Sequence, residues 1–232
     1  MNEIPKNLAT SGGPIDRRVM SGAYVRVGPR GSILFAAREE ACVLALWHRQ
    51  IADCVARELD RLAFDGLPAF DVLGGVVSVR AEARAAIDRS ALAGSAMGRW
   101  LESDIAGLCC RYAAVTGGGR MHVRLAAIDD DACRYFHVDR LSMRLLCTYR
   151  GPGTQWVAPE TSVRGTGGPE VTSVLEAAPH LIRQVPTRSI ALFRGRTPDT
   201  QSPGLLHRSP PPAQGNDNHR LVLTVSTGGA FA

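Results

Sequence analysis

The stretch TGGGRMHVRLAAI, residues 116–128, is where the hydrophobic pattern of the chain changes. Before it, apolar residues recur at intervals of three and four, as on a helix. From Met121 to Ile128 the period is two, as in a strand with one buried face. The three glycines between the patterns favour a break in the backbone. The sequence therefore predicts helices first and strands afterwards, which is typical of an α+β domain.

Two helical regions are predicted ahead of the glycines. Over residues 37–63, apolar side chains recur at helical spacing, with charged residues between them, and a glycine and a proline follow. A second helix is predicted over roughly 81–112, where alanine is abundant and Gly94 and Gly98 are weak points.

Short strands separated by turns rich in glycine, proline and aspartate are predicted after the glycines. They span Met121–Ile128, Tyr135–Asp139, Met143–Tyr149, Ser189–Phe193, Leu205–Ser209 and His219–Ser226. Such strands would form a sandwich or barrel with the helices on one outer face. The long stretch 159–186, with a short helix near 170–178, is either a lid or a surface insertion.

Length and composition predict a single domain over residues 1–232, because a chain of this size with 45% hydrophobic residues can bury a sizeable core. Within it we expect a polar N-terminal segment, 1–30, a helical region, 37–116, and a strand core, 120–228. The first residues lack an apolar signal region, and no uncharged run is long enough to span a bilayer. A cytoplasmic protein with no membrane partner and six reduced cysteines is therefore expected.

The positive charge of the chain comes almost wholly from arginine, because Lys6 is the only lysine and the formal net charge is +5. This excludes a phosphate-binding loop with its invariant lysine, and a lysine that would form a Schiff base with pyridoxal phosphate. The arginines are spread along the chain, so nucleic acid is not signalled as a partner. The charge suits an acidic small-molecule substrate, and a homodimer is left open.

A candidate metal site lies in the strand region. In His137-Val138-Asp139 an imidazole and a carboxylate two residues apart would share one face of a strand. His207, from a later strand, would complete a set of two histidines and one carboxylate. This set holds non-haem Fe(II) and leaves coordination positions open, although the same ligands suit other divalent metals.

Arg220 is a candidate cosubstrate-binding residue. On the predicted last strand it shares a face with Val222, Thr224 and Ser226, while the opposite face is mainly apolar. A buried arginine needs a partner, since an unpaired buried charge is costly. The carboxylate of a cosubstrate would serve, and so would a neighbouring aspartate or glutamate.

Four segments together resemble the 2-oxoglutarate/Fe(II)-dependent dioxygenase superfamily. They are FHVD at 136–139, SIALFRG at 189–195, LLHRSP at 205–210 and RLVL at 220–223. The resemblance implies a double-stranded β-helix over 120–228, a jelly-roll or cupin-like barrel with the N-terminal helices packed outside. His207 follows His137 by 70 residues and Arg220 follows His207 by 13, in keeping with the order of the superfamily.

The resemblance implies that His137, Asp139 and His207 are catalytic metal ligands and that Arg220 binds 2-oxoglutarate. The superfamily often has a serine two residues after this arginine, whereas Val222 stands here. A second contact to the cosubstrate would then come from Tyr149 or Thr148.

The segments FHVD and RLLCTYRGPGT, residues 144–154, also resemble an uncharacterised bacterial family of unknown function. Its members are often encoded near zinc-responsive metallochaperone GTPases, and it brings no assigned substrate.

Two functions follow from these patterns. The first is an oxygenase that uses Fe(II) and 2-oxoglutarate to hydroxylate or otherwise oxidise a small-molecule or peptide substrate that the sequence does not identify. The second is a non-catalytic metal-binding β-barrel that handles Zn(II) or another divalent metal. Arg220 separates them, because the oxygenase needs it and a metal store does not. A third interpretation leaves the histidines merely hydrogen-bonded in a core.

Overall fold

The structure is a computed structural model that describes residues 23–129, 133–158, 179–211 and 219–227. The helices are η1 Gly31–Arg38, α1 Asp53–Arg61, η2 Phe64–Gly66, α2 Val76–Asp88, α3 Ala96–Thr116 and η3 Pro179–Leu181, where η marks 3₁₀ turns. The strands are β1 Tyr24–Gly28, β2 Cys42–Trp47, β3 Phe70–Gly74, β4 Met121–Ile128, β5 Met143–Arg150, β6 Gln155–Val157, β7 Ile182–Gln184, β8 Ile190–Arg194, β9 His207–Arg208 and β10 Arg220–Thr227.

Within the described residues the strands form two sheets. The large sheet has the order β1-β2-β8-β5-β10-β4-β3, and the small sheet has the order β7-β6-β9. An isolated antiparallel bridge between His137 and His207 extends the small sheet beyond β9. Strand pairs are antiparallel except for β1 and β2.

From β4 onward the chain winds between the two sheets. It passes from β4 in the large sheet to the His137 bridge in the small one, returns in β5, and enters the small sheet again as the β6–β7 pair. Strands β8, β9 and β10 then alternate between the large and small sheets. This path is that of a double-stranded β-helix, so the predicted fold class is confirmed.

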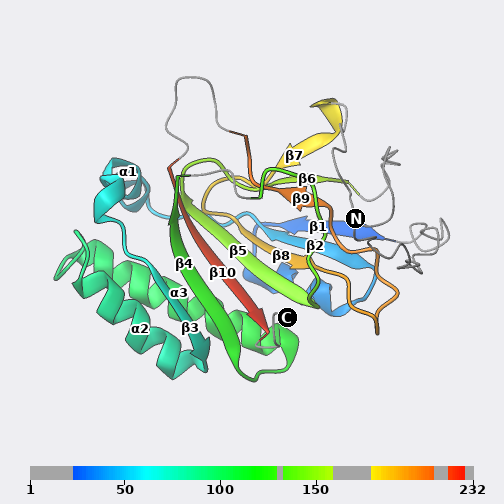
Figure 1. The fold of residues 1–232 in the computed structure, drawn as a ribbon, viewed down its shortest axis with the longest axis horizontal. Coiled ribbons are helices and arrows are strands. Elements are labelled where there is room, and N and C mark those ends of the chain that lie inside the picture. Colours follow the sequence, from blue (N-terminus) through cyan, green and yellow to red (C-terminus); the bar gives the residue numbers. More distant parts are fainter. Residues whose placement is uncertain (1–22, 130–132, 159–178, 212–218, 228–232) are drawn as a thin grey trace, which may run out of the picture.

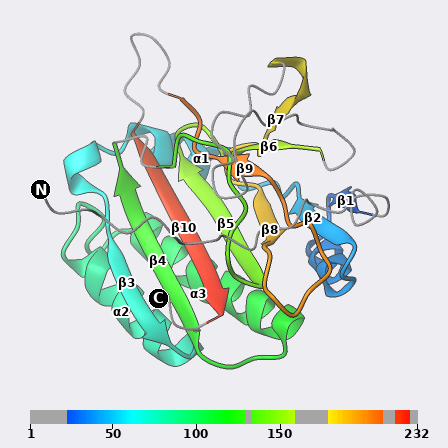
Figure 2. The same ribbon diagram turned by 45° about the vertical axis from the view of Figure 1, so that its right-hand side comes forward.

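The long helices α2 and α3 lie on the opposite face of the large sheet from the small sheet (Figures 1 and 2). Helices α2 and α3 cover one face, and the small sheet lies over the upper end of the other. A large apolar core fills the space beneath the helices, and a smaller one lies between the sheets. The N-terminal helices therefore pack outside the strand core, as predicted.

Strand β10 shows how one element serves both cores. Leu221, Leu223 and Val225 belong to the core beneath the helices, whereas Val222 belongs to the core between the sheets. Because side chains alternate along a strand, Arg220 shares the inner face with Val222. The predicted division of this strand into two faces is confirmed.

The helix predicted over residues 37–63 is wrong in its first part. Cys42–Trp47 is strand β2, paired with β1 and β8, and helix α1 begins only at Asp53. All of Cys42–Leu46 is buried, with some side chains in each core. A strand buried on both faces is apolar throughout, and such a run is not distinguishable from a helix by its period.

The helix predicted over 81–112 is two helices. Helix α2 begins earlier, at Val76, and α3 begins at Ala96, where the Ser95 hydroxyl accepts a hydrogen bond from the Gly98 amide. Gly94 lies between them at φ +66°, a conformation that favours glycine. Gly98 is instead part of α3. A side chain at this position would meet the Leu92 carbonyl oxygen at 2.5 Å, so the close approach requires glycine.

Some of the predicted segments fall on residues that the structure does not describe. These are most of the polar N-terminal segment, apart from β1 at its end, and the short helix near 170–178. Strands β1, β2, β3, β6 and β7 were not predicted. In the described part of the chain, no helix has the length and apolarity needed to cross a membrane.

Gly153, between β5 and β6, lets two segments of the strand core meet, because an added Cβ would lie 1.9 Å from the Val185 carbonyl oxygen. We expect Gly153→Ala to lower the free energy of unfolding by more than about 2 kcal/mol. Gly107→Ala is the control: Gly107 lies in α3 with nothing near its added Cβ, so it should stabilise by about 0.5–1 kcal/mol. Urea unfolding measures both, and equal midpoints for the two variants would contradict this packing.

Candidate metal centre

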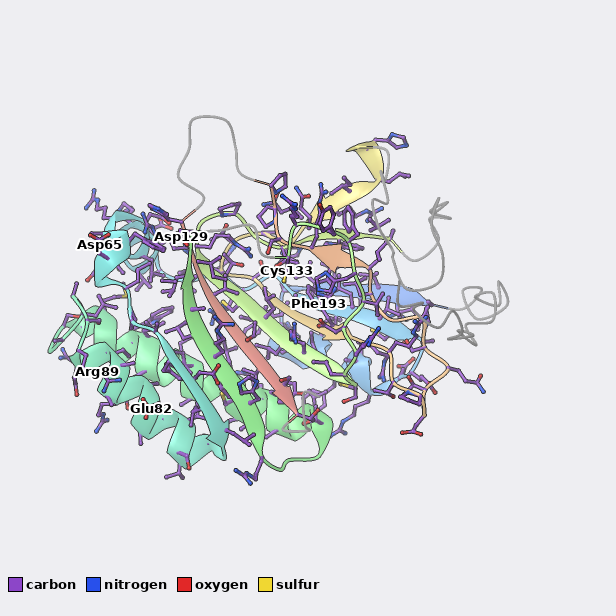
Figure 3. All side chains as sticks on the ribbon, in the orientation of Figure 1. Asp65, Glu82, Arg89, Asp129, Cys133 and Phe193 are labelled. Atoms are coloured by element: carbon purple, nitrogen blue, oxygen red, sulfur yellow. The ribbon has the colours of Figure 1, made fainter. Side chains whose placement is uncertain are left out.

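Two histidines lie side by side on neighbouring segments of the small sheet. His137 and His207 exchange both backbone hydrogen bonds, each 2.9 Å from nitrogen to oxygen. Directly paired residues on antiparallel strands project to the same side, and the ring centroids are 4.6 Å apart. Phe193 of β8 lies against the His207 ring at 4.8 Å between centroids, close to β9 (Figure 3).

The segment that carries Asp139 is held by its backbone. The Asp139 carbonyl accepts a hydrogen bond from the Arg196 amide at 2.8 Å. Gly195 packs so closely that a Cβ there would lie 2.5 Å from the Asp139 carbonyl oxygen and 3.1 Å from Asp139 Cβ. Gly204, at φ +69°, would likewise meet Val138. The glycines after β8 therefore determine where the carboxylate lies.

The three side chains that the sequence singled out come together. One ligand atom from each of His137, Asp139 and His207 lies within 4.8 Å of the other two. Nε2 of His137 is 3.8 Å from Asp139 Oδ1, and Nε2 of His207 is 3.7 Å from Asp139 Oδ2. The predicted convergence is thus present.

The hydrogen bonds of both rings suit a ligand role. His137 Nδ1 lies 3.0 Å from the Tyr135 carbonyl, and His207 Nδ1 lies 2.9 Å from the Leu205 carbonyl. A carbonyl oxygen only accepts, so the proton is assigned to Nδ1 and the lone pair to Nε2, which faces Asp139. Burial lowers the pKa of His207 to about 4, which keeps this imidazole neutral near pH 7.

The carboxylate has one satisfied oxygen and one unsatisfied oxygen. Asp139 Oδ1 accepts a hydrogen bond from Arg144 Nη1 at 3.1 Å. Asp139 Oδ2 is buried and has no hydrogen-bond partner among the described residues. A buried carboxylate oxygen without a partner is costly, and a cation between it and the two Nε2 atoms would satisfy all three. The residues present therefore fit a divalent metal.

Arg220 is buried with few partners. Its side chain begins the inner face of β10, and the residue is 2% exposed. Nη1 donates to the Ser209 hydroxyl at 3.2 Å and Nη2 to the Thr154 hydroxyl at 3.4 Å, while Nε has no partner in the described part of the chain. Burial lowers the pKa of Arg220 to about 10, so the guanidinium remains charged near pH 7. No described carboxylate forms an ion pair with it.

Tyr149 does not belong to this site, so its predicted role in cosubstrate binding is wrong. Its side chain lies in the core beneath the helices, and its hydroxyl donates to Asp104 Oδ2 of α3 at 2.6 Å. Burial raises the pKa of this hydroxyl well above its ordinary value. Thr148, the other candidate, pairs with Val222 in register and so faces inward, where its buried hydroxyl has no described partner.

Three further residues of the site were not predicted from sequence. Arg144 contacts Asp139, and Thr154 and Ser209 accept hydrogen bonds from Arg220. Arg144 and Thr148 are four positions apart on one strand, so alternation would have placed them on the same face. Thr154 lies just before β6, where no periodic pattern identifies it. Ser209 lies two residues after His207 on the predicted strand Leu205–Ser209, so alternation could have indicated it.

The chain matches a family model over most of its length. The model of a family described as "Protein of unknown function (DUF1826)" matches residues 28–226. The chain belongs to this family. The expected membership of a family without an assigned function is therefore confirmed, whereas the gene neighbourhood stays an expectation.

Solved structures resemble the chain only distantly. A 2-oxoglutarate binary complex of dioxygenase for auxin oxidation 1 from Arabidopsis thaliana aligns with a TM-score of 0.43 and 10% identity, covering 90% of this chain and 93% of that one. A full-length protein from Neurospora crassa in complex with alpha-KG aligns with a TM-score of 0.40 and 11% identity, covering 85% of this chain and 77% of that one. No curated protein matches the chain.

Gly195 is the residue whose replacement tests how Asp139 is held. Gly195→Ala should push the Asp139 backbone away and weaken Zn(II) binding about tenfold to a hundredfold, as changes beside metal ligands commonly do. Gly107→Ala should bind Zn(II) as the wild type does. Isothermal titration at a temperature where each variant is folded measures this, and unchanged affinity in Gly195→Ala would contradict the packing argument.

Tyr149→Phe tests whether Tyr149 contributes to stability alone or also to metal binding. Removing a hydrogen bond to a carboxylate should cost about 2 kcal/mol of stability. Because Tyr149 faces away from Asp139 and Arg220, Zn(II) affinity should not change. Urea unfolding and metal titration of the same sample test both statements. Weaker metal binding at unchanged stability would place Tyr149 back in the site.

Proposed function

We propose that the protein is an oxygenase that depends on Fe(II) and 2-oxoglutarate. One observation carries the proposal: two histidines and a carboxylate converge on the inner side of the double-stranded β-helix that also buries Arg220. If Arg220 were buried only to form a structural ion pair, a carboxylate partner would be expected, and none is found among the described residues. If the two histidines were only hydrogen-bonded core residues, the buried Asp139 Oδ2 would not be left without a partner.

The roles of the residues follow from their contacts. His137 and His207 would bind the metal through Nε2, while their Nδ1–H groups hold the rings in place against backbone carbonyls. Asp139 would supply the third ligand, oriented by Arg144. Two imidazoles and a carboxylate suit Fe(II) and leave coordination positions for other ligands, and they also suit Zn(II).

Arg220 would bind the distal carboxylate of 2-oxoglutarate. Its guanidinium is already desolvated and oriented by Ser209 and Thr154, so pairing with a carboxylate would require little rearrangement. The inward-facing Thr148 hydroxyl is the candidate for the second contact, in place of Tyr149. When bound, Fe(II) and 2-oxoglutarate supply the oxidising chemistry, and the protein supplies position, orientation and exclusion of water.

Replacing Arg220 tests the proposal. Arg220→Leu should weaken 2-oxoglutarate binding on the order of a hundredfold, because a charge-assisted pair in a desolvated site is lost. Fe(II) affinity should stay nearly unchanged. The weak visible charge-transfer band of the Fe(II)–2-oxoglutarate chelate, titrated without oxygen, reports cosubstrate binding. Arg99→Leu, at an exposed arginine of α3, is the control for the loss of one positive charge.

Arg220→Leu should also change the stability of the protein. Without cosubstrate, Arg220→Leu should unfold at an equal or higher urea concentration than the wild type, because a buried arginine without a carboxylate partner costs stability. His137→Ala should remove the metal and, with it, the charge-transfer band. Equal 2-oxoglutarate affinity in wild type and Arg220→Leu, or no binding by either, would favour the metal-handling barrel instead.

A further inference from the structure

Arg144 lies at the opposite end of the inner face from Arg220. It pairs in register with Ser226 of β10, which is six residues along that strand from Arg220. At about 3.3 Å per residue, the two arginine backbones are roughly 20 Å apart along the strand direction. The three converging side chains lie between them, since Arg144 contacts Asp139 and Arg220 contacts Ser209, two residues after His207.

The inner face near Arg144 carries polar side chains and becomes exposed only towards the edge strand β3. A row crosses the large sheet from Leu73 through His122 and Ser226 to Arg144, because these residues are paired strand by strand. The small sheet lies over the other end of this face (Figures 1 and 2). Leu73 is 48% exposed, and the His137 side chain is 37% exposed. One ligand side chain of the metal centre, His137, therefore reaches the surface, whereas Ser226 beside Arg144 is 3% exposed.

Arg144 has donors to spare. Its guanidinium carries five N–H groups, and within the described residues its one side-chain hydrogen bond is the Nη1 contact to Asp139. Its side chain is 23% exposed, compared with 7% for Asp139. The guanidinium thus bridges a buried carboxylate and the accessible surface, which is a suitable position for recognising a group that arrives from outside.

With a divalent metal ion and 2-oxoglutarate bound, the site would carry one more positive charge than negative charges. A divalent ion with Arg144 and Arg220 brings four positive charges. Asp139 and the two carboxylates of 2-oxoglutarate bring three negative ones. An unbalanced charge in a partly buried site is costly. A single carboxylate would balance it, whereas a phosphate, with a charge near −2 at neutral pH, would exceed it.

We propose that Arg144 binds a carboxylate of the primary substrate, so that the substrate is a monocarboxylate that approaches along the inner face of β4, β10 and β5. This inference rests on the oxygenase proposal. Arg144 acts as a specificity-determining residue: the carboxylate pairs with the N–H groups that Asp139 does not use, and the rest of the substrate extends towards the metal.

The test uses three small probes of similar size, namely propanoate, propanamide and ethyl phosphate. Each is titrated into the full-length protein loaded with Zn(II) and 2-oxoglutarate, and amide chemical shifts report binding. Zn(II) replaces Fe(II) so that no oxidation occurs, and 2-oxoglutarate occupies the Arg220 end. We expect propanoate to bind at least about tenfold more tightly than propanamide or ethyl phosphate.

Two variants locate the binding. Arg144→Gln should lose the preference for propanoate over propanamide. Because it also removes the hydrogen bond to Asp139, its Zn(II) affinity should fall about tenfold to a hundredfold, so the probes are titrated with Zn(II) and 2-oxoglutarate at concentrations shown to saturate this variant. Arg144→Lys, which keeps the charge but not the planar fork, should retain part of the preference. Arg124→Gln is the matched control: Arg124 is exposed on the same face of the large sheet, and it has no recorded contact with Asp139 among the described residues.

Three results would overturn the proposal. These are equal binding of propanoate and propanamide by the wild type, an unchanged preference in Arg144→Gln, or tighter binding of ethyl phosphate. Should the protein bind no 2-oxoglutarate, the oxygenase proposal fails separately. The probes are then titrated into Zn(II)-loaded Arg220→Leu, where the Arg220 end no longer offers a guanidinium. A preference that persists there still supports the Arg144 site, and its absence refutes it.

Discussion

The pair of backbone hydrogen bonds between His137 and His207 is the contact on which the candidate site depends. The two residues are far apart in sequence, and this bridge holds their strands in a single register. A shift of one residue would turn one imidazole to the other side of the small sheet, away from Asp139. The bridge itself is short, so its position is set by neighbouring packing, above all by the glycines after β8 that adjoin Val138 and Asp139.

Charge inside the double-stranded β-helix is arranged around that bridge. Arg144 and Arg220 flank the converging side chains along one face of the large sheet, and only Arg144 has a described carboxylate partner. Burying Arg220 without such a partner disfavours the folded state, which natural proteins tolerate at sites that bind an oppositely charged ligand. The stabilising contribution comes instead from the apolar core on the far side of the sheet.

The sequence predicted β4, β5, β8 and β10 to within one residue at each end, whereas the predicted strand Tyr135–Asp139 is only the His137 bridge and the predicted strand Leu205–Ser209 is only β9. Met121–Ile128 matches β4 residue for residue, and the last strand differs by one residue at each end. Cys42–Trp47 was mistaken for part of a helix because both of its faces are buried. The three-residue strands β6 and β7 are too short to show a period.

Within the site, the metal ligands and Arg220 could be identified, whereas the neighbours of these residues could not. Deciding whether Tyr149 or Thr148 faces the site requires knowing which residue of β5 pairs with Val222. A single sequence does not specify this strand register. The register also shifts between Leu221 and Val222, so counting from Arg220 alone would misplace the partners on β5. Arg144 becomes visible only once this register is known.

The alternation along β5 has a consequence for how such a protein can change over time. Leu145, Cys147 and Tyr149 contribute to the core beneath the helices, while Arg144 and Thr148 face the candidate site. Residues on opposite faces share few contacts, so the effects of substitutions on the two faces should be close to additive. A lineage could therefore acquire a new ligand preference by replacing inward-facing residues of this strand, without disturbing the packing that keeps the chain folded.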